Sequence, residues 1–370
     1  MLNRYQICSV CILLSLSPLS ALVSALDHQE EIAIQSFQKK SEEKLKETPK
    51  LVAPPNPSKL YLQPCPDAWR LSMDFLYLLP TVDDTYFAIS SPIVGNFTLL
   101  GTRSNNDFGF NPGFRVGAEY AFCETRRDIQ VFYTYLHAEQ TRAISGDNMW
   151  ATQGSVQFST PFGDYAGTAS SKLKLLYQRW DFNVSQHIID AHGFNLYVQP
   201  GLEYAYFRLQ QNYRYNAEAL FPGTAYHRSR GWGVGPQLGL GFDSNLYSGS
   251  IRSNYSLTHA VTLSGLFSSS ILTGQGQTKE LDIRDGQTTN NIQDAQAWRT
   301  IPALHARAGL TYLVHGSRMG ASLYMGYELD TYIRGCAKML FPSSSSASNI
   351  TTNYYNFDIQ GLDISVALTF

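Results

Sequence analysis

The chain has 370 residues, of which 16% are charged and 13% are aromatic, and its net charge is −2. A typical soluble domain has ~25% charged residues, and a disordered chain is rich in charge and poor in aromatics, so the composition excludes a largely disordered protein. Helical membrane bundles need runs of ~20 apolar residues, and this composition argues against them. The nearly neutral charge also offers no basic surface for nucleic acid.

Residues 1–25 have the pattern of a secretory signal peptide. Arg4 supplies positive charge, residues 7–19 form an apolar core, and small residues precede a predicted cleavage after Ala25. The alternative is an N-terminal membrane anchor, but the apolar core is short for a membrane span.

Residues 26–68 differ from the rest of the chain. Glutamate and lysine concentrate between residues 30 and 47, and Pro54-Pro55-Asn56-Pro57 enforces an extended backbone. We expect a short solvated helix followed by a linker, both on the periplasmic side of the outer membrane. A coiled coil is not supported, because heptads are not sustained.

From residue 69 onward the hydrophobic period is two. In the clearest run, Trp232, Val234 and Leu238 alternate with glycines between 231 and 241. Such alternation predicts a strand with one apolar face. Similar runs occur at 69–77, 114–122, 180–184, 196–206, 304–312, 323–329 and 362–370.

The predicted connections differ in length. Four short ones fall near 123–127, 186–192, 244–248 and 315–318, and five long ones at 80–110, 139–171, 210–230, 273–298 and 334–353. These nine connections join ten strands if 249–272 is one long, bent strand. Hairpins hidden in the long loops would raise the count to as many as fourteen. Short turns at one end and long loops at the other are the arrangement of outer-membrane barrels.

We therefore predict an all-β protein: an antiparallel transmembrane β-barrel of 10–14 strands over residues 69–370, in the bacterial outer membrane. A closed sheet leaves no unpaired backbone groups in lipid, and Tyr and Trp suit the interfacial girdles. A secreted β-sandwich also alternates, but its solvent face should carry more charge. Pro200 and Pro236 fit neither fold in mid-strand, and we expect bulges or strand ends there.

Strand parity assigns ten charged side chains, four basic and six acidic, to the barrel lumen. They either pair across a plugged interior or line a wet channel with a slight cation preference. The lumen of a ten-stranded barrel is narrow in any case, because the interior of a barrel of ~8 strands is already filled by side chains. The ten residues are Arg70, Asp74, Arg115, Glu119, Arg179, Asp181, Glu203, Arg307, Glu328 and Asp330. The same parity makes His305 a lumen residue.

A succession of short motifs links the chain to a known family. They include Phe75-Leu76-Tyr77, Asn111-Pro112-Gly113-Phe114-Arg115, Trp180-Asp181-Phe182, Pro200-Gly201-Leu202 and Gly326-Tyr327-Glu328. In this order, over residues 69–370, they resemble the Legionella-type major outer membrane proteins, a porin family with relatives in chlamydia-like bacteria. The resemblance implies a β-barrel, diffusive passage of small solutes and frequent disulfide linkage in the envelope, and it carries no catalytic residues.

The C-terminal strand resembles the signal that the barrel-assembly machinery reads. Apolar residues stand at every second position up to the terminal aromatic residue, namely Leu362, Ile364, Val366, Leu368 and Phe370.

Three cysteines remain after the predicted signal peptide, and their spacing matches no metal motif. The predicted topology puts Cys65 and Cys123 at the periplasmic end and Cys336 at the outer end of a strand. Our hypothesis is a Cys65–Cys123 disulfide, with Cys336 free for intermolecular linkage.

Two function hypotheses follow. The first is a porin for passive diffusion of small hydrophilic solutes, weakly cation-selective. The second is a structural or adhesive surface barrel with a plugged lumen, working through loops 273–298 and 334–353. No nucleophile elbow, His-Glu-x-x-His or phosphate-binding loop occurs, so we expect no enzyme activity, cofactor or metal. His187 and His192 are better explained as a polar turn than as metal ligands.

The expected partners are outer-membrane lipid and the barrel-assembly machinery. A homo-oligomer or disulfide-linked envelope partners are left open, and nucleic acid is not expected.

Overall fold

The computed structural model describes residues 68–370, and the regular structure in this range is antiparallel β-sheet. Within the range, the residues that are not described are 84, 91–101, 123–124, 147–148, 152–166, 192, 218–219, 253–255, 285–286, 295, 317–318 and 341–350. The predicted signal peptide and nearly all of the predicted charged extension lie outside the described residues. In the described part of the chain, no helix is long and apolar enough to cross a membrane.

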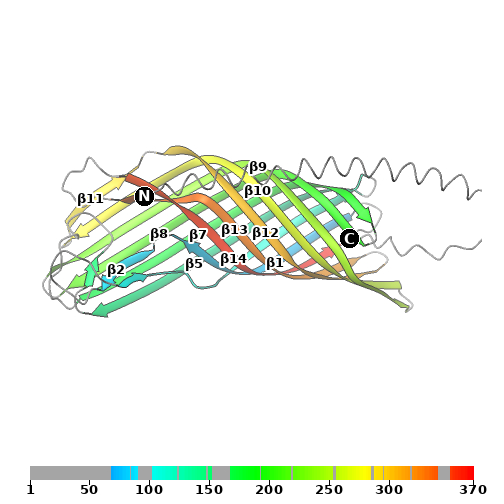
Figure 1. Ribbon diagram of the computed structural model, residues 1–370, viewed down its shortest axis with the longest axis horizontal. Coiled ribbons are helices and arrows are strands. Elements are labelled where there is room, and N and C mark those ends of the chain that lie inside the picture. The colour runs from blue at the N-terminus through cyan, green and yellow to red at the C-terminus, as the bar shows by residue number, and fades with distance from the viewer. Residues whose placement is uncertain are drawn as a thin grey trace, which may run out of the picture. The chain divides into compact units, whose positions relative to one another are not determined.

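Ten long strands form a closed barrel in which each pairs with the next along the chain and the last pairs with the first (Figure 1). Two backbone hydrogen bonds of 2.9 Å join Trp69 to Phe370 at this closure. The predicted antiparallel barrel is thus confirmed, at the lower limit of its predicted strand count. The ten strands are β1 (Ala68–Val82), β4 (Asn111–Phe122), β5 (Arg127–Gly146), β7 (Gly167–Ala191), β8 (Phe194–Ala217), β9 (Leu220–Arg252), β10 (Ser256–Arg284), β12 (Ala297–His315), β13 (Gly320–Leu340) and β14 (Thr351–Thr369).

Four shorter strands complete the described structure. β2 (Tyr86–Ser90) pairs with β3 (Thr102–Asn105) and β6 (Met149–Ala151), and β11 (Gln287–Gln293) pairs with the end of β10. β2 and β11 lie at the end of the barrel opposite the C-terminus (Figure 1). The C-terminal end carries the short turns, so it is the periplasmic end, and the other end is extracellular.

Several strand boundaries differ from those predicted. The predicted loop 210–230 is a hairpin of β8 and β9, and the predicted loop 273–298 contains the end of β10, all of β11 and the start of β12. β9 continues through the predicted turn 244–248 to Arg252, and the strand predicted over 249–272 is instead Ser256–Arg284.

The strands are longer than a membrane requires. A transmembrane strand needs ~9–11 residues, whereas β9 has 33 and β10 has 29. The wall therefore continues into water beyond the outer leaflet. Both faces can be polar there, so the hydrophobic alternation ends while the hydrogen-bonded ladder continues.

An apolar belt surrounds the outside of the barrel. On β1 the side chains of Trp69, Leu71, Met73, Phe75 and Tyr77 are 44–64% exposed. A soluble protein would not expose such a continuous apolar surface, whereas in a membrane it faces lipid.

Aromatic residues bound this belt at both ends. Trp69 and Tyr120 lie 4.9 Å apart (ring centroids) at the periplasmic end, and Trp232 contacts Tyr204 at 6.4 Å and Trp298 at 6.0 Å at the extracellular end. These rings form the interfacial girdles typical of transmembrane barrels.

Pro200 and Pro236 lie inside β8 and β9, with neither a strand end nor a register shift at either position, so the expectation of bulges or strand ends there is wrong. Around Pro200 the pairing of β8 with β7 is interrupted between Gly201 and Val198, and around Pro236 the pairing of β9 with β10 is interrupted between Gln237 and Val234. The register is the same on both sides of each interruption. Each proline thus removes local hydrogen bonds without shifting the strand.

The glycines of β9 allow the neighbouring strand to approach closely. A Cβ atom on Gly235 would collide with the backbone of Ile271 and lie 3.0 Å from the Cα of Leu272, whereas a Cβ on Gly109 would meet no atom within 4 Å. We expect Gly235→Ala to destabilise the barrel by about 1–3 kcal/mol, because overpacking forces the strands apart. Urea unfolding in lipid vesicles measures the effect, with Gly109→Ala as control. Equal unfolding midpoints for the two variants would show that the close approach is not needed.

Candidate functional site

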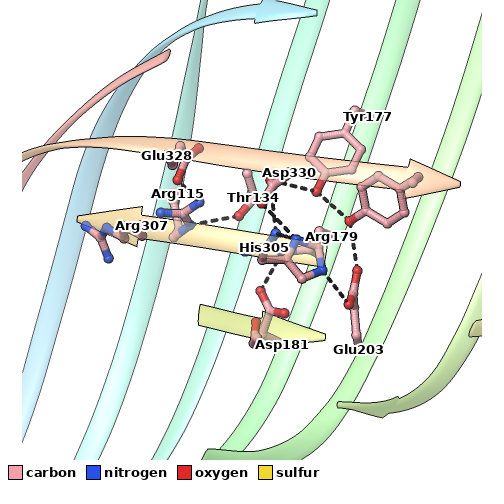
Figure 2. A network of polar contacts seen from close by, with 12 residues as sticks. Arg115, Thr134, Tyr177, Arg179, Asp181, Glu203, His305, Arg307, Glu328 and Asp330 are labelled. Atoms are coloured by element: carbon pink, nitrogen blue, oxygen red, sulfur yellow. Dashed lines mark hydrogen bonds and ion pairs between the residues drawn. The ribbon is translucent and has the colours of Figure 1, made fainter. Parts of the chain in front are cut away.

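The candidate site is the barrel interior, where charged side chains from opposite walls pair with one another (Figure 2). Arg115 of β4 lies at the centre of the first group. Its guanidinium nitrogens are 2.6 Å from Glu328 and 3.3 Å from both Asp74 and Asp363, and its Nε donates a hydrogen bond to Thr134 at 3.0 Å. The four charged residues are at most 4% exposed, so they are shielded from water and their ion pairs are strong.

Arg307 of β12 contributes a second cation to this group. Its Nε lies 2.6 Å from Asp363 and its Nη2 lies 3.5 Å from Asp74, and its guanidinium stands over the ring of Tyr324 at 4.1 Å. Two arginines therefore share three carboxylates. The group connects β1, β4, β12, β13 and β14 through the interior.

A second group surrounds His305 of β12. Its Nε2 lies 2.9 Å from Glu203 and its Nδ1 lies 2.8 Å from Asp330. Arg179 of β7 lies 2.8 Å from Asp181 and 3.0 Å from Asp330. Ser270 donates a hydrogen bond of 2.6 Å to Glu203. Because β7, β8, β10, β12 and β13 contribute, this group also bridges walls that are not adjacent in the sheet.

Two tyrosines connect the charged group around His305 to a layer of aromatic rings on its extracellular side. Tyr332 donates a 2.8 Å hydrogen bond to Glu203, and its hydroxyl lies 2.8 Å from that of Tyr177. The rings of Tyr177, Phe207, Tyr332 and Phe357 are 4.7–6.1 Å apart. They come from β7, β8, β13 and β14, so opposite walls meet across the lumen at this level.

Aliphatic side chains extend the aromatic layer into an apolar plug that nearly every wall of the barrel supplies. All its members are at most 6% exposed, so at this level the described side chains occupy the lumen and exclude water. The apolar plug consists of Leu76, Leu78, Val82, Phe108, Leu136, Ala138, Leu173, Leu175, Tyr177, Ala205, Phe207, Leu209, Leu272, Ile301, Ala303, Tyr332, Cys336, Phe357 and Ile359.

A third layer lies toward the extracellular mouth, where β2 packs inside the wall. Phe87 of β2 is fully buried, and its carbonyl accepts a 2.7 Å hydrogen bond from Tyr215. His227 lies 2.7 Å from Glu280, and the ammonium of Lys338 stands 6.0 Å from the ring centroid of Tyr213. The interior thus remains filled above the apolar plug.

The structure places the ten predicted lumen charges as follows. Seven are buried in the interior: Asp74, Arg115, Arg179, Asp181, Glu203, Glu328 and Asp330. Arg70 and Glu119 form a 3.8 Å ion pair in which Arg70 is partly exposed, and the Arg307 side chain is 28% exposed.

The prediction omitted Asp363, which shares an interior strand face with Ser365 and which parity alone could have identified. It also omitted Tyr177, Tyr332 and the apolar plug.

Cys336 is 2% exposed and packs within the apolar plug. Burial of the thiol at this position argues against the expected intermolecular linkage through Cys336, which stays a prediction. Cys65 and Cys123, for which a disulfide was expected, lie outside the described residues.

His187 belongs to a polar network at the periplasmic end. It lies 2.9 Å from both Asn195 and Asp128, and His192 lies outside the described residues. No group of three or more His, Cys, Asp or Glu side chains in the described ranges has an arrangement that could hold a metal ion.

The closed sheet, the lipid-facing apolar belt and the polar interior define an outer-membrane β-barrel. Residues 63–370 match the family model described as the Legionella pneumophila major outer membrane protein precursor, and the chain belongs to this family. This confirms the predicted family and the predicted location in the bacterial outer membrane. No curated protein matches the chain.

Among solved structures, the chain is similar to the outer membrane protease OmpT from Escherichia coli (TM-score 0.40, 11% identity, covering 84% of this chain and 98% of that one). It is also similar to the Ralstonia pickettii toluene transporter TbuX (TM-score 0.27, 12% identity, covering 82% of this chain and 88% of that one). A Pseudomonas aeruginosa FadL homologue is similar as well (TM-score 0.24, 9% identity, covering 82% of this chain and 90% of that one). These likenesses concern the fold, and the activities in the names belong to those proteins.

Proposed function

We propose that this protein is a structural surface barrel of the outer membrane whose lumen is filled, so that it acts through its extracellular end and not as an open pore. The observation that carries the proposal is the contact of Tyr177, Phe207, Tyr332 and Phe357 across the lumen. Ions crossing at this level would have to pass through a dry apolar layer, and such constrictions block conduction.

Opening the lumen by moving these side chains has a large energetic cost. Burying one large apolar side chain contributes ~1.5–3 kcal/mol, and the four rings would have to leave their contacts together. Tyr332 would also lose its hydrogen bond to Glu203. Spontaneous opening is therefore rare under this proposal.

The extracellular end offers a surface for contact with the environment. The walls of β8, β9 and β10 extend beyond the apolar belt, and the β2–β3–β6 sheet stands at the mouth. A cavity of about 460 Å³ lies there, lined by Asp83, Tyr86, Arg103 and Asp107, among others. Deleting 273–298 is no test of a loop function, because this range contains barrel strands.

The porin hypothesis remains the second candidate. The charged lumen below the apolar plug favours it, as does the porin character of the family that the chain resembles. In the two charged groups, six carboxylates face three arginines and His305, and this excess of carboxylates would give a passage a cation preference. Under this alternative the apolar plug has to rearrange before solutes pass.

We also propose that the protein has no enzymatic activity. The charges of the groups around Arg115 and His305 are paired with one another, and the sequence offers no catalytic motif.

Swelling of proteoliposomes in isotonic solutions of small sugars tests the proposed function. Heat-modifiable migration on a gel first establishes that the protein is folded. We expect wild-type vesicles to swell no faster than vesicles without protein. Rapid swelling that depends on sugar size would establish the porin and refute the filled barrel.

A further inference from the structure

A basic patch lies on the outer wall of the barrel, just beyond the extracellular aromatic girdle. Its members are Arg208 of β8, Arg228 and Arg230 of β9, and Lys279 of β10. They have the same strand parity as Trp232 and Val234, whose side chains face lipid, so the four side chains point away from the lumen. The patch is separate from the interior charge groups.

The register places like charges directly opposite each other in two adjoining pairs. Arg208 pairs with Arg230, and Arg228 pairs with Lys279. Directly opposite residues have Cβ atoms ~4.5–5.5 Å apart, and like charges there are destabilising. An anion bound at two such pairs side by side would relieve their repulsion.

The described residues do not supply that anion. No carboxylate lies within ion-pair distance of the four cations in this part of the chain, and the Nε of Arg228 is shielded from solvent without a hydrogen-bond acceptor. Arg230 has only an amide partner, Gln277 at 2.9 Å. By contrast, Lys172 and Lys174 on β7 share the carboxylate of Glu139.

The height of the patch matches that of lipid headgroups. On the same face of β9, Arg230 precedes Trp232 of the girdle by two residues and Arg228 precedes it by four, which corresponds to ~7 and ~13 Å along the strand toward the extracellular end. The headgroup region on each side of a bilayer is ~5–8 Å thick, since the whole bilayer measures ~40–45 Å and its core ~30 Å. With strands tilted by ~35–45°, these distances become ~5–6 Å and ~9–11 Å along the membrane normal. The pair Arg208 and Arg230 therefore lies within the headgroup region of the outer leaflet. The pair Arg228 and Lys279 lies just beyond it, where long side chains can reach back to the headgroups.

We propose that the basic patch is a binding site for the phosphate groups of an anionic outer-leaflet lipid. The three guanidinium groups can each present paired N–H donors to phosphate oxygens, and Lys279 adds a point charge. The acyl chains of such a lipid would lie along Tyr204, Trp232 and Val234 below the patch. Phosphate ions in solution offer the same headgroup chemistry but no chains for this surface.

Native mass spectrometry of the full-length protein, extracted from phosphatidylcholine vesicles that contain diphosphorylated lipid A, tests the proposal. We expect the wild-type protein to retain lipid A. The quadruple variant R208Q/R228Q/R230Q/K279Q should retain at least about tenfold less lipid A than wild type. The control K172Q/K174Q removes two cations that Glu139 already neutralises, and it should retain lipid A like wild type. Heat-modifiable migration checks that each variant is folded.

Three outcomes would overturn the proposal. Equal retention by wild type and the quadruple variant would show that the patch does not hold the lipid. Equal retention of chemically dephosphorylated lipid A would show that phosphate is not recognised. Complete displacement of lipid A by millimolar inorganic phosphate would identify a site for the free anion. Should the quadruple variant fail to fold, R228Q/K279Q replaces it with the same controls.

Discussion

Arg115→Leu is expected to destabilise the folded barrel by about 3–5 kcal/mol, because removing one partner of a buried ion pair leaves uncompensated charge in the interior. The Arg115 guanidinium contacts three carboxylates, those of Asp74, Glu328 and Asp363. In the variant, Arg307 would be the remaining arginine of this group, and it reaches only Asp74 and Asp363. Urea unfolding in lipid vesicles, followed by the loss of the heat-modifiable band, gives the unfolding free energy.

Arg70→Leu is the matched control for this measurement. Arg70 also faces inward, but it is partly exposed and lies 3.8 Å from Glu119. Such a pair is worth about 0–1 kcal/mol. If Arg115→Leu unfolds at the same urea concentration as Arg70→Leu, the ion-pair network does not stabilise the barrel.

The double variant Phe207→Ala/Phe357→Ala is expected to convert a silent barrel into a conducting one. The two rings lie 5.6 Å apart across the lumen, are at most 2% exposed, and take no part in the charged layer. Removing both opens a wet path through the apolar plug, at a cost in stability of about 3–5 kcal/mol per ring. Stepwise, salt-dependent current in planar bilayers is the expected readout.

Phe182→Ala/Tyr327→Ala serves as control, because these two aromatic side chains are about half exposed on the lipid-facing side. It should remain silent. A folded Phe207→Ala/Phe357→Ala variant that passes no current would show that the apolar plug is not what closes the lumen.

Strand alternation was sufficient to predict the barrel, and the predicted range of 10–14 strands has the ten long strands of the structure as its lower limit. Parity also assigned ten charged side chains to the interior, but the prediction omitted Asp363. The signal depends on a contrast between lipid outside and polar groups inside. It is present in Trp232 to Phe242, where glycines alternate with apolar residues. Beyond the membrane both faces contact water or polar groups, so the sequence pattern predicts loops where the extracellular ends of β8, β9 and β10 lie.

The apolar plug could not be predicted for a related reason. Leu76 and Leu78 follow Asp74 on the inward face of β1, while Tyr77 faces outward, so both faces are apolar there. Such a run does not reveal that its inward side chains meet others across a lumen. That contact depends on the strand tilt and stagger, which set the diameter of a ten-stranded barrel.

The charged residues illustrate the same limit. Parity placed Arg115, Glu328 and Asp330 inside, but it left open whether they pair or line a channel. The pairing depends on which strands face each other, and Arg115 on β4 reaches Glu328 on β13 only in the closed barrel. Only the three-dimensional structure supplied this information.

Single-channel recording of the folded wild-type protein in planar bilayers tests the filled lumen most directly. The apolar plug predicts a baseline without current steps over a range of salt concentrations and voltages, in preparations whose heat-modifiable migration shows complete folding. Reproducible ohmic steps from the wild-type protein would contradict it and would establish an open channel.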